Sequence, residues 1–565
     1  MSRILYPKIK SCLENSIKYR FPQLKDSKLN IELFLCHQLS HGDLYSNIIF
    51  KLTNLLKDDI QNIGNNILLE LEREIEKDSF LKNIVKKIDF RLPGFINFFL
   101  SEKYLYREVI NCLIEGDKFG SSDYGKGSSV LVEFVSANPT GPLSIAHGRQ
   151  AAIGDALANV LSFLGYKVER EYYINDEGIQ MDNLAKSIWV RFRQLLGEEK
   201  DFPIDGYKGD YIFEIAKRIP LDRERFKEWD IETRDFFIRF GCEEILKIIR
   251  GDLVNFGVKF DNWVSQSFLI KSGCVKEVIA SLEEKGFIYH KEGAFWLKST
   301  LFGDDKDRVV RKSDGSLTYI ASDIAYHKDK YERGFNWLIN LWGPDHHGYI
   351  SRLRAAVKAL GYDEEKLKIL IVQLANLYRN GKVVPMSTRA GTFITLEEVV
   401  KEIGKDVARF FFLSRRLDSH LDFDIALAKK DSAENPVYYL QYAHARINSL
   451  KEHARERGIE LDKILSDSKV IDLLISHFQE EELNIIRLIH QFHYIILEVE
   501  RNLEPNILIV YLQMLAKTFH QYYARYRIID SDIEKSYTRL IMAMAVGVVI
   551  GNGLKLLGIS LPEKM

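Results

Sequence analysis

The segment from Ser128 to Tyr166 limits the possible folds more than any other part of the chain. The residues SSVLVEFVSA favour a buried β-strand, and HGRQAAIGDALANVLSFLGY has helical spacing. The loop NPTGPLSIA joins them, and its two prolines and glycine restrict the backbone. A helix start offers unpaired N–H groups and a positive dipole end. This strand-to-helix turn is therefore typical of a phosphate-binding site.

Strands continue to alternate with helices after this turn. YKVEREYYI and WLINLWG have the pattern of strands, and HHGYISRLRAAVKALG has the pattern of a helix. This alternation predicts a parallel sheet covered by helices, with ligands at the carboxyl ends of its strands. A charged, helix-patterned region from about 190 to 300 is expected to be an insertion with a solvated face.

Two further domains are expected to flank this sheet. Residues 1–112 mix helical segments with short strand-like runs such as LNIELFLC, which predicts a small α+β domain. The sheet domain would occupy residues 113–430. Helical periodicity alone runs through residues 431–565 and predicts a bundle. Its apolar stretch LIMAMAVGVVIGNGLKLLG is too short to span a bilayer and predicts a buried helix.

Composition excludes few partners. The chain has 565 residues, with 79 Lys plus Arg against 80 Asp plus Glu, so net charge neither indicates nor excludes a nucleic acid. Its five cysteines form no C-x-x-C pair, which favours reduced thiols in a cytoplasmic protein and no structural metal. The sequence has neither a P-loop nor a G-x-G-x-x-G motif after the strand.

The phosphate-loop segment resembles the first signature motif of class I aminoacyl-tRNA synthetases in its arginyl form. Ser144-Ile145-Ala146-His147 stands where the class has His-Ile-Gly-His, and KVVPMSTRAGTFIT (382–395) resembles the second signature loop. Further segments that resemble the arginyl family, in the same order, are YYINDEGIQM, TYIASDIAYHKDKY, WGPDHHGYISRL, DVARFFFLSRR, PVYYLQYAHARINSL and LGISLPEKM.

The resemblance implies an arginine–tRNA ligase. Such an enzyme activates L-arginine with ATP and Mg²⁺ to arginyl-adenylate, releases pyrophosphate, and transfers arginine to the terminal adenosine of tRNA(Arg). The sheet domain would then be a Rossmann-like catalytic domain, the amino-terminal domain would bind tRNA, and the bundle would bind the anticodon. The family also suggests a cytoplasmic monomer that needs no membrane and activates arginine only with tRNA present.

The resemblance also assigns site residues. ATP-binding and catalytic roles fall on Ser144, His147, Gly148, Met386, Ser387 and Arg389. Arginine-binding roles fall on Glu133, Ser136, Asn138, His147, Tyr319, Asp323 and His347. The signature segment comprises Ala137, Asn138, Pro139, Thr140, Gly141, Pro142, Leu143, Ser144, Ile145, Ala146 and His147. Anticodon contacts are expected from Tyr438, Tyr442, Arg446 and Arg525. A planar guanidinium with five donors prefers carboxylates, which agrees with Glu133 and Asp323.

Several alternatives stay open. Asp323 could instead cap a helix, and the bundle tyrosines could be core residues. Ser144, Ala146, Pro385 and Thr388 depart from the strongest versions of the two motifs and predict a slower or differently supported activation step. These departures would also suit a weakened paralogue that only binds tRNA or nucleotide. A small-molecule nucleotidyltransferase is a third possibility, although it would not need the helical domain.

Overall fold

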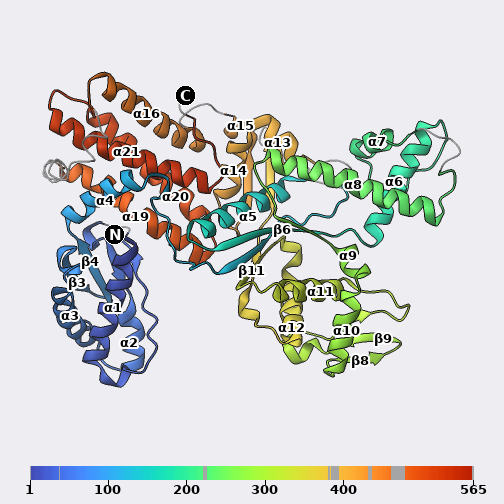
Figure 1. Cartoon of the computed structure of the whole chain (residues 1–565), viewed down its shortest axis with the longest axis horizontal. Helices are drawn as coiled ribbons and strands as arrows, with labels where there is room; N and C mark the ends of the chain where they lie inside the picture. Colours follow the sequence, from blue (N-terminus) through green and yellow to red (C-terminus); the bar gives the residue numbers. More distant parts are fainter. Residues whose placement is uncertain are drawn as a thin grey trace.

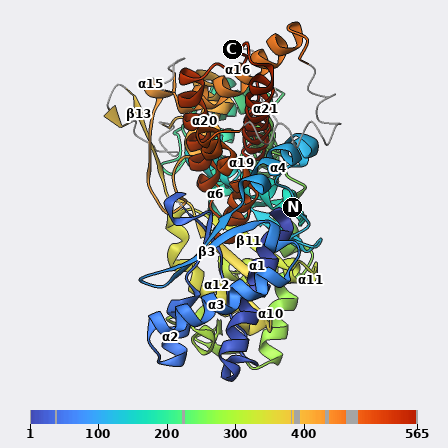
Figure 2. The ribbon, with the colours of Figure 1, turned by 90° about the vertical axis from the view of Figure 1, so that its left-hand side faces the viewer.

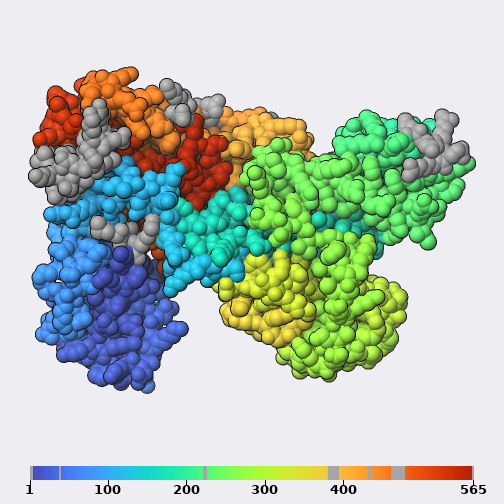
Figure 3. Space-filling model, viewed as in Figure 1, coloured from blue at the N-terminus to red at the C-terminus, as the bar shows by residue number. Residues whose placement is uncertain are grey.

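The computed structural model describes residues 2–36, 39–220, 226–379, 382–383, 393–429, 435–459 and 478–562. Figure 1 shows the amino-terminal unit at the lower left, the carboxy-terminal helices above it, and a central sheet with two lobes on its right. In the space-filling view the amino-terminal unit and the lower lobe stand apart, with the sheet region bridging them (Figure 3).

The central sheet has five parallel strands in the order β12-β11-β5-β6-β7. These strands are β5 (Ser129–Glu133), β6 (Lys167–Ile174), β7 (Asn262–Ser265), β11 (Trp337–Trp342) and β12 (Leu367–Ile371). The predicted parallel sheet is therefore confirmed. The strand order reverses between β5 and β11, so the loops that leave these two strands diverge and open a crevice at their carboxyl ends.

Helix α5 (Ile145–Phe163) follows β5 and is buried along most of its length. It packs closely on the strand because Gly154 has no side chain: a Cβ there would lie 2.2 Å from the Phe134 ring. The helix also contacts α14 (Lys405–Leu413) and α19 (Glu480–Asn502). Helix α5 therefore joins the central sheet to the carboxy-terminal part of the chain.

Two lobes replace the single helical insertion expected from about 190 to 300. Helices α6 (Ile179–Leu195), α7 (Asp210–Lys217) and α8 (Ile231–Asn255) form the first lobe, and the chain then returns to the main sheet as β7. The second lobe contains α9 (Gln266–Lys271), α10 (Cys274–Glu284), β8 (Ile288–Lys291), β9 (Ala294–Leu297), β10 (Arg308–Arg311), α11 (Tyr319–Glu332) and α12 (Ile350–Leu360). Strand β7 has only four residues, NWVS, and no clear alternation marks it in the sequence.

The amino-terminal unit is an α+β layer. Helices α1 (Ser2–Arg20), α2 (Ile48–Leu56) and α3 (Ile60–Lys77) accompany the antiparallel strands β1 (Phe34–Leu35), β2 (Leu44–Ser46), β4 (Phe95–Leu100) and β3 (Val85–Arg91), in that order. The predicted boundary at residue 112 falls inside α4 (Glu102–Glu115), which packs on α19 and on α21 (Ile533–Leu556). Helix α4 thus connects the unit to the bundle.

The carboxy-terminal domain is helical, as predicted. It contains α16 (Pro436–Glu456), α19, α20 (Asn506–Arg525) and α21, which run close together in Figure 2. Helix α21 is long and apolar enough to cross a membrane, but 83% of its apolar window is buried inside the protein. It is therefore a core helix of the bundle, as its sequence indicated.

A small sheet lies between the main sheet and the bundle. Strand β13 (Ala375–Arg379) pairs with β14 (Lys382–Val383) and β15 (Leu421–Asp424), and helices α13 (Leu396–Ile403), α14 and α15 (Ile425–Ala428) complete this region. Arg149 of α5 holds it in place. Its guanidinium donates to the backbone oxygens of Gln373, Ser419 and Arg416 at 2.7, 2.9 and 2.8 Å.

Arg409 of α14 joins four elements in the core. It is fully buried and donates to Asp155 Oδ2 of α5 at 2.6 Å. Its other nitrogens donate to the carbonyl of Leu557 after α21 at 2.9 Å and to that of Phe256 after α8 at 3.3 Å. The guanidinium therefore connects helix α5 to both the helical lobe and the bundle.

Replacing Arg409 with methionine is expected to destabilise the protein strongly. Arg409→Met would leave two buried carbonyls unpaired and Asp155 with only the longer contacts to Arg170 at 3.3 Å and Asn159 at 3.4 Å. Breaking such a buried pair costs about 3–5 kcal/mol. Urea unfolding followed by tryptophan fluorescence measures the loss. Arg416→Met, which removes a 65% exposed side chain, should cost at most about 1 kcal/mol. Equal losses in both variants would contradict the assigned role.

Candidate active site

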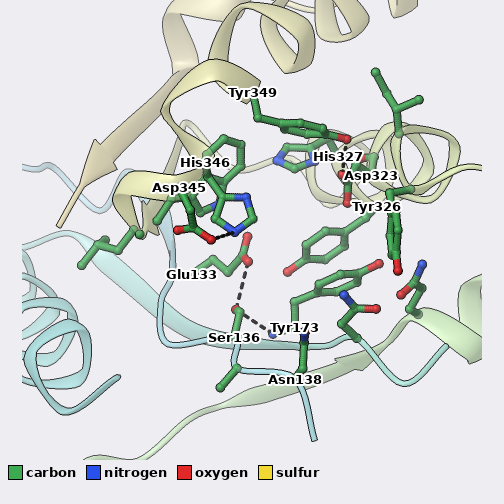
Figure 4. A pocket seen from close by; sticks show the side chains of 18 of the residues that line it. Glu133, Ser136, Asn138, Tyr173, Asp323, Tyr326, His327, Asp345, His346 and Tyr349 are labelled. Carbon is green, nitrogen blue, oxygen red and sulfur yellow. Dashed lines mark hydrogen bonds and ion pairs between the residues drawn. The ribbon is translucent and has the colours of Figure 1, made fainter. Parts of the chain in front are cut away.

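A cavity of about 750 Å³ lies at the carboxyl ends of β5 and β11. Strand β6, helix α11 and the 3₁₀ turn η6 (Pro344–Tyr349) supply its other walls. Figure 4 shows the side chains of Glu133, Tyr173 and Asp323 converging on this space. Its volume suits a small ligand. The predicted position of the site, at the end of the sheet where strand order reverses, is thus occupied by a cavity.

The chain leaves β5 through a strained turn. Val135 and Ser136 have φ angles of +68° and +39°, which are unusual for residues with side chains, above all for β-branched valine. This turn brings Ser136 Oγ within 3.0 Å of Glu133 Oε1, to which it donates. Ser136 Oγ also accepts from the backbone N–H of Tyr173 at 3.1 Å. The turn therefore positions Ser136 so that its hydrogen bonds hold Glu133 in the cavity.

His147 faces the cavity from the first turn of α5. The N–H of Ser144 donates to His147 Nδ1 at 3.2 Å, so the ring hydrogen is assigned to Nε2. Burial lowers the pKa of His147 to about 4. The imidazole is therefore neutral at pH 7 and available as a donor. Ser144 is the N-cap residue, is only 8% exposed, and lines neither this cavity nor its neighbour.

The other signature residues hold the helix in place. A Cβ on Gly148 would lie 2.6 Å from Leu396 Cδ1, so this glycine faces α13 and allows it to pack closely. Leu396 N donates to Leu143 O at 2.7 Å, and Ser144 forms a β-bridge with Thr395. The first signature loop is thus bonded to the residues that follow the second. Met386, Ser387 and Arg389 lie outside the described residues, as do Pro385 and Thr388.

A smaller cavity of about 310 Å³ adjoins the first. Both are lined by Asn138, His147 and Gln180, and Asn138 Nδ2 donates to Gln180 Oε1 at 2.6 Å between them. Tyr207 and Tyr211 of the helical lobe and Phe393 close the second cavity. Within the signature segment, Thr140, Gly141 and Pro142 line this smaller cavity, whereas Ala137 lines only the larger one.

Glu133 already has a cation within the protein. Lys330 Nζ lies 2.5 Å from Glu133 Oε2 and also donates to Asn340 Oδ1 at 3.0 Å. The Lys330 side chain is completely buried, and its ammonium lies 4.2 Å from the centroid of the Tyr326 ring. The Glu133–Lys330 pair is therefore neutral as a unit, with no solvent to screen either charge.

Asp323 has no such partner. Among the carboxylates that line the cavity in the described parts of the chain, it alone forms no ion pair, and Tyr349 Oη donates to its Oδ2 at 2.5 Å. Burial and the nearby charge of Glu133 raise the pKa of Asp323 to about 6, whereas the Tyr349 hydrogen bond lowers it. Asp323 is not the N-cap of α11, which is Thr318, so the capping alternative is wrong.

A hydrogen-bonded chain supports these groups from behind. His327 Nδ1 lies 2.8 Å from the carbonyl of Asp323, and its Nε2 lies 2.9 Å from Asn340 Nδ2. Burial, with the charge of Lys330, lowers the pKa of His327 to about 3. A neutral ring that donates from Nδ1 and accepts at Nε2 satisfies both contacts. Sequence reasoning missed Lys330, His327 and Asn340, because only the packing of α11 on β11 brings them together.

The remaining predicted arginine-binding residues are spread over the cavity. Tyr319 lines its mouth and is 57% exposed. His347 is exposed and does not line the cavity, whereas its neighbours Asp345 and His346 do. His347 points elsewhere because η6 turns with a 3₁₀ period, which places adjacent residues on different faces.

The predicted anticodon-contact residues lie on α16 and α20. The rings of Tyr438 and Tyr442 stack with centroids 6.0 Å apart and an angle of 11°. Arg446 Nη2 donates to Tyr442 Oη at 2.6 Å, and its guanidinium lies 4.5 Å from the centroid of the Tyr523 ring. Arg525 is exposed at the end of α20. The two tyrosines and Arg446 thus form one half-buried group on α16.

Three family profiles match the chain. They are described as arginyl tRNA synthetase N terminal domain (residues 7–100), tRNA synthetases class I (R), catalytic domain (108–411), and DALR anticodon binding domain (440–565). The arginine–tRNA ligase of Geobacillus kaustophilus is 44% identical over 531 residues, 93% of each chain. That of Bacillus subtilis is 42% identical over 540 residues, 95% of this chain and 94% of its own.

A solved structure has the same fold. Arginyl-tRNA synthetase from Thermus thermophilus superimposes with a TM-score of 0.77 over 98% of this chain and 99% of its own. The two sequences are only 20% identical, so this similarity concerns the fold alone.

Removing Lys330 is expected to destabilise the site. Lys330→Met would leave Glu133 as an unpaired buried carboxylate, at a cost of about 3–5 kcal/mol. Adding Glu133→Gln should restore much of this loss, because the buried charge is then gone. Thermal unfolding of both variants measures the effect. Lys328→Met, which removes a partly exposed lysine from the same helix, is the control and should have little effect. A double variant no more stable than Lys330→Met would contradict the pairing argument.

Proposed function

Because the chain belongs to the arginyl-tRNA synthetase family and ligates arginine to tRNA(Arg), we propose that the larger cavity binds arginine and that the start of α5 binds the phosphates of ATP. The observation that carries this proposal is the partly buried carboxylate of Asp323, which has no ion-pair partner among the described residues. A guanidinium would give Asp323 the cation that it lacks in the described structure, with charge-assisted hydrogen bonds.

The predicted arginine-binding residues take different roles in this proposal. Asp323 pairs with the guanidinium, whereas Glu133, already neutralised by Lys330, acts as a fixed polar wall. Tyr319 covers the mouth of the cavity, and Ser136 orients Glu133. The bond from Asn138 to Gln180 uses only the amide nitrogen, so the amide oxygen of Asn138 can accept from the α-ammonium.

Activation depends on position and charge neutralisation. The arginine carboxylate attacks the α-phosphate of ATP and pyrophosphate leaves, which requires alignment more than a protein nucleophile. Neutral His147 donates from Nε2 to a phosphate oxygen, and the N–H groups at the start of α5 add a positive dipole end. We assign Met386, Ser387 and Arg389 to the pyrophosphate, and Gly148 to helix packing beside the nucleotide.

ATP would bring Mg²⁺ into the site. In the described parts of the chain, no group of three or more His, Cys, Asp or Glu side chains could hold a metal. Mg²⁺ keeps several waters and is commonly bound through substrate phosphates, so this donor set fits a metal carried by ATP. When bound, Mg²⁺ neutralises phosphate charge. We propose no structural metal in the protein.

The anticodon would meet the helical domain. Single-stranded RNA is recognised by stacking of its bases on aromatic and guanidinium groups, and the half-buried group of Tyr438, Tyr442 and Arg446 offers such surfaces. We include Arg525 as a phosphate contact. We further propose that the enzyme is a cytoplasmic monomer that acts without a membrane.

Arginine-dependent exchange of pyrophosphate into ATP tests the whole proposal. We expect exchange that requires both arginine and tRNA(Arg). The competing reading, a weakened paralogue that only binds tRNA or nucleotide, predicts no exchange under any condition. It rests on the departures at Ser144, Ala146, Pro385 and Thr388, but Ser144 still caps α5 and orients His147.

Asp323→Asn should reduce kcat/KM for arginine by at least about 100-fold, because a hydrogen bond between two charged groups becomes one to a neutral amide. The KM for ATP should change little. In the unmodified enzyme, kcat/KM for arginine should fall about tenfold per pH unit below pH 6, as the raised pKa of Asp323 lets it protonate. Initial charging rates at saturating ATP and tRNA measure both effects.

The control is Asp329→Asn on the same helix. Asp329 is 43% exposed and pairs with Arg333 outside the cavity lining. The Asp329→Asn substitution should leave both kcat/KM for arginine and its pH profile unchanged. His346 also faces Asp323, and a pH break that persists in Asp323→Asn would assign the titration to another group. If Asp323→Asn reduced kcat/KM for arginine and for ATP by the same factor, the arginine pocket would have to lie elsewhere.

A further inference from the structure

The hydroxyl group of Tyr173 is buried in the larger cavity without a hydrogen-bond partner among the described residues. The side chain is only 9% exposed. The hydroxyl groups of the neighbouring tyrosines both have acceptors: Tyr326 Oη donates to Glu171 at 2.7 Å, and Tyr349 Oη donates to Asp323. A buried polar atom without a partner costs folding free energy, so its presence requires an explanation.

The ring of Tyr173 is held in one orientation. It stacks on Tyr326 with centroids 4.2 Å apart and an angle of 16°. Tyr326 is in turn anchored by Glu171, which accepts two bonds from Arg333 at 2.6 and 2.9 Å. Figure 4 shows the two tyrosine rings side by side within the cavity. Tyr173 therefore cannot turn its hydroxyl toward solvent without losing the stack.

The acceptors around Tyr173 are already partly occupied. Glu133 accepts from Ser136 on one oxygen and pairs with Lys330 on the other, and Asp323 Oδ2 accepts from Tyr349. A guanidinium carries five N–H donors and no acceptor. Asp323 alone cannot satisfy all of them. The guanidinium therefore needs further, neutral acceptors in the cavity.

Gln266 also has a buried side-chain oxygen without a hydrogen-bond partner among the described residues. It lines the cavity from the start of α9, is 5% exposed, and its Oε1 has no partner in the described structure. Tyr173 and Gln266 come from the neighbouring strand β6 and the helix after β7. Two buried oxygens without partners thus face the cavity that contains the unpaired carboxylate.

We propose that Tyr173 is a further specificity-determining residue, whose phenolic oxygen accepts a guanidinium N–H that Asp323 leaves unbound, with Gln266 as the second neutral acceptor. This inference rests on the proposed arginine site. A lysine ammonium is a compact charge that can pair with Asp323 without reaching Tyr173 or Gln266. These two acceptors therefore favour binding of arginine over lysine. A site built to bind a donor also rejects analogues that leave its acceptors unpaired.

Tyr173→Phe isolates the oxygen because it keeps the ring and its stack. With tRNA(Arg) saturating, kcat/KM for arginine should fall roughly 10- to 100-fold, as for one lost hydrogen bond to a charged group. The KM for ATP should stay unchanged. The melting temperature without arginine should stay equal or rise, since a buried hydroxyl without a partner is removed. A merely structural tyrosine would instead show a lower melting temperature.

Two inhibitors locate the contact on the ligand. Agmatine keeps the guanidinium but lacks the α-carboxylate, so its inhibition constant should rise by a factor similar to that for arginine. The constant for L-lysine should not change. An agmatine constant that stays unchanged would place Tyr173 at the other end of arginine and overturn the inference.

Tyr104→Phe is the matched control. Tyr104 lies on α4, is 4% exposed, and has a buried hydroxyl that also lacks a partner in the described structure. Removal of this hydroxyl should leave kcat/KM for arginine unchanged. If Tyr173→Phe behaves like Tyr104→Phe while Asp323→Asn loses arginine use, the inference is wrong and the arginine site stands. If neither cavity variant affects arginine use, the site itself is misplaced.

Discussion

Charge balance in a buried cavity constrains the rest of this structure. Two carboxylates, Glu133 and Asp323, share a space with little solvent, and each would protonate if the other remained ionised nearby without a cation. Lys330 neutralises Glu133 at 2.5 Å, which leaves Asp323 as the member of this pair of carboxylates without a cation. Arg308 also lines the cavity but is paired with Asp304. A ligand guanidinium can therefore pair with Asp323 while Lys330 keeps Glu133 neutralised.

The same helix that begins at the cavity also connects the outlying parts of the protein. Arg149 holds the small sheet around the second loop, and Arg409 joins Asp155 of α5 to the ends of α8 and α21. The bond from Leu396 to Leu143 adds α13. A shift in the bundle on tRNA binding would thus reach the start of α5 through fully buried, hydrogen-bonded groups. This arrangement suits the proposed requirement of tRNA for activation.

The sequence predicted the parallel sheet, the cavity position and the helical bundle because each depends on local periodicity. It did not predict β7, whose four residues carry no alternation. The predicted domain boundary at residue 112 falls inside α4, because the sequence pattern does not show that this helix packs on α19 and α21. Sequence reasoning missed Lys330, Asn340 and His327, because these residues come together only in the folded protein, where α11 lies against β11. His347 was expected in the cavity instead of its neighbour His346, because a 3₁₀ turn changes which residue faces inward.

The departure at Ser144 has a structural consequence different from the one its position in the motif suggests. A histidine there would offer a charge to phosphate, but Ser144 is buried and instead caps α5. Its backbone N–H fixes the tautomer of His147, and burial keeps that ring neutral. The positive potential for phosphate must then come from the helix end and from cations outside it. In the proposed mechanism, activation therefore relies more on the backbone of the signature loop, and less on imidazole charge, than the standard motif implies.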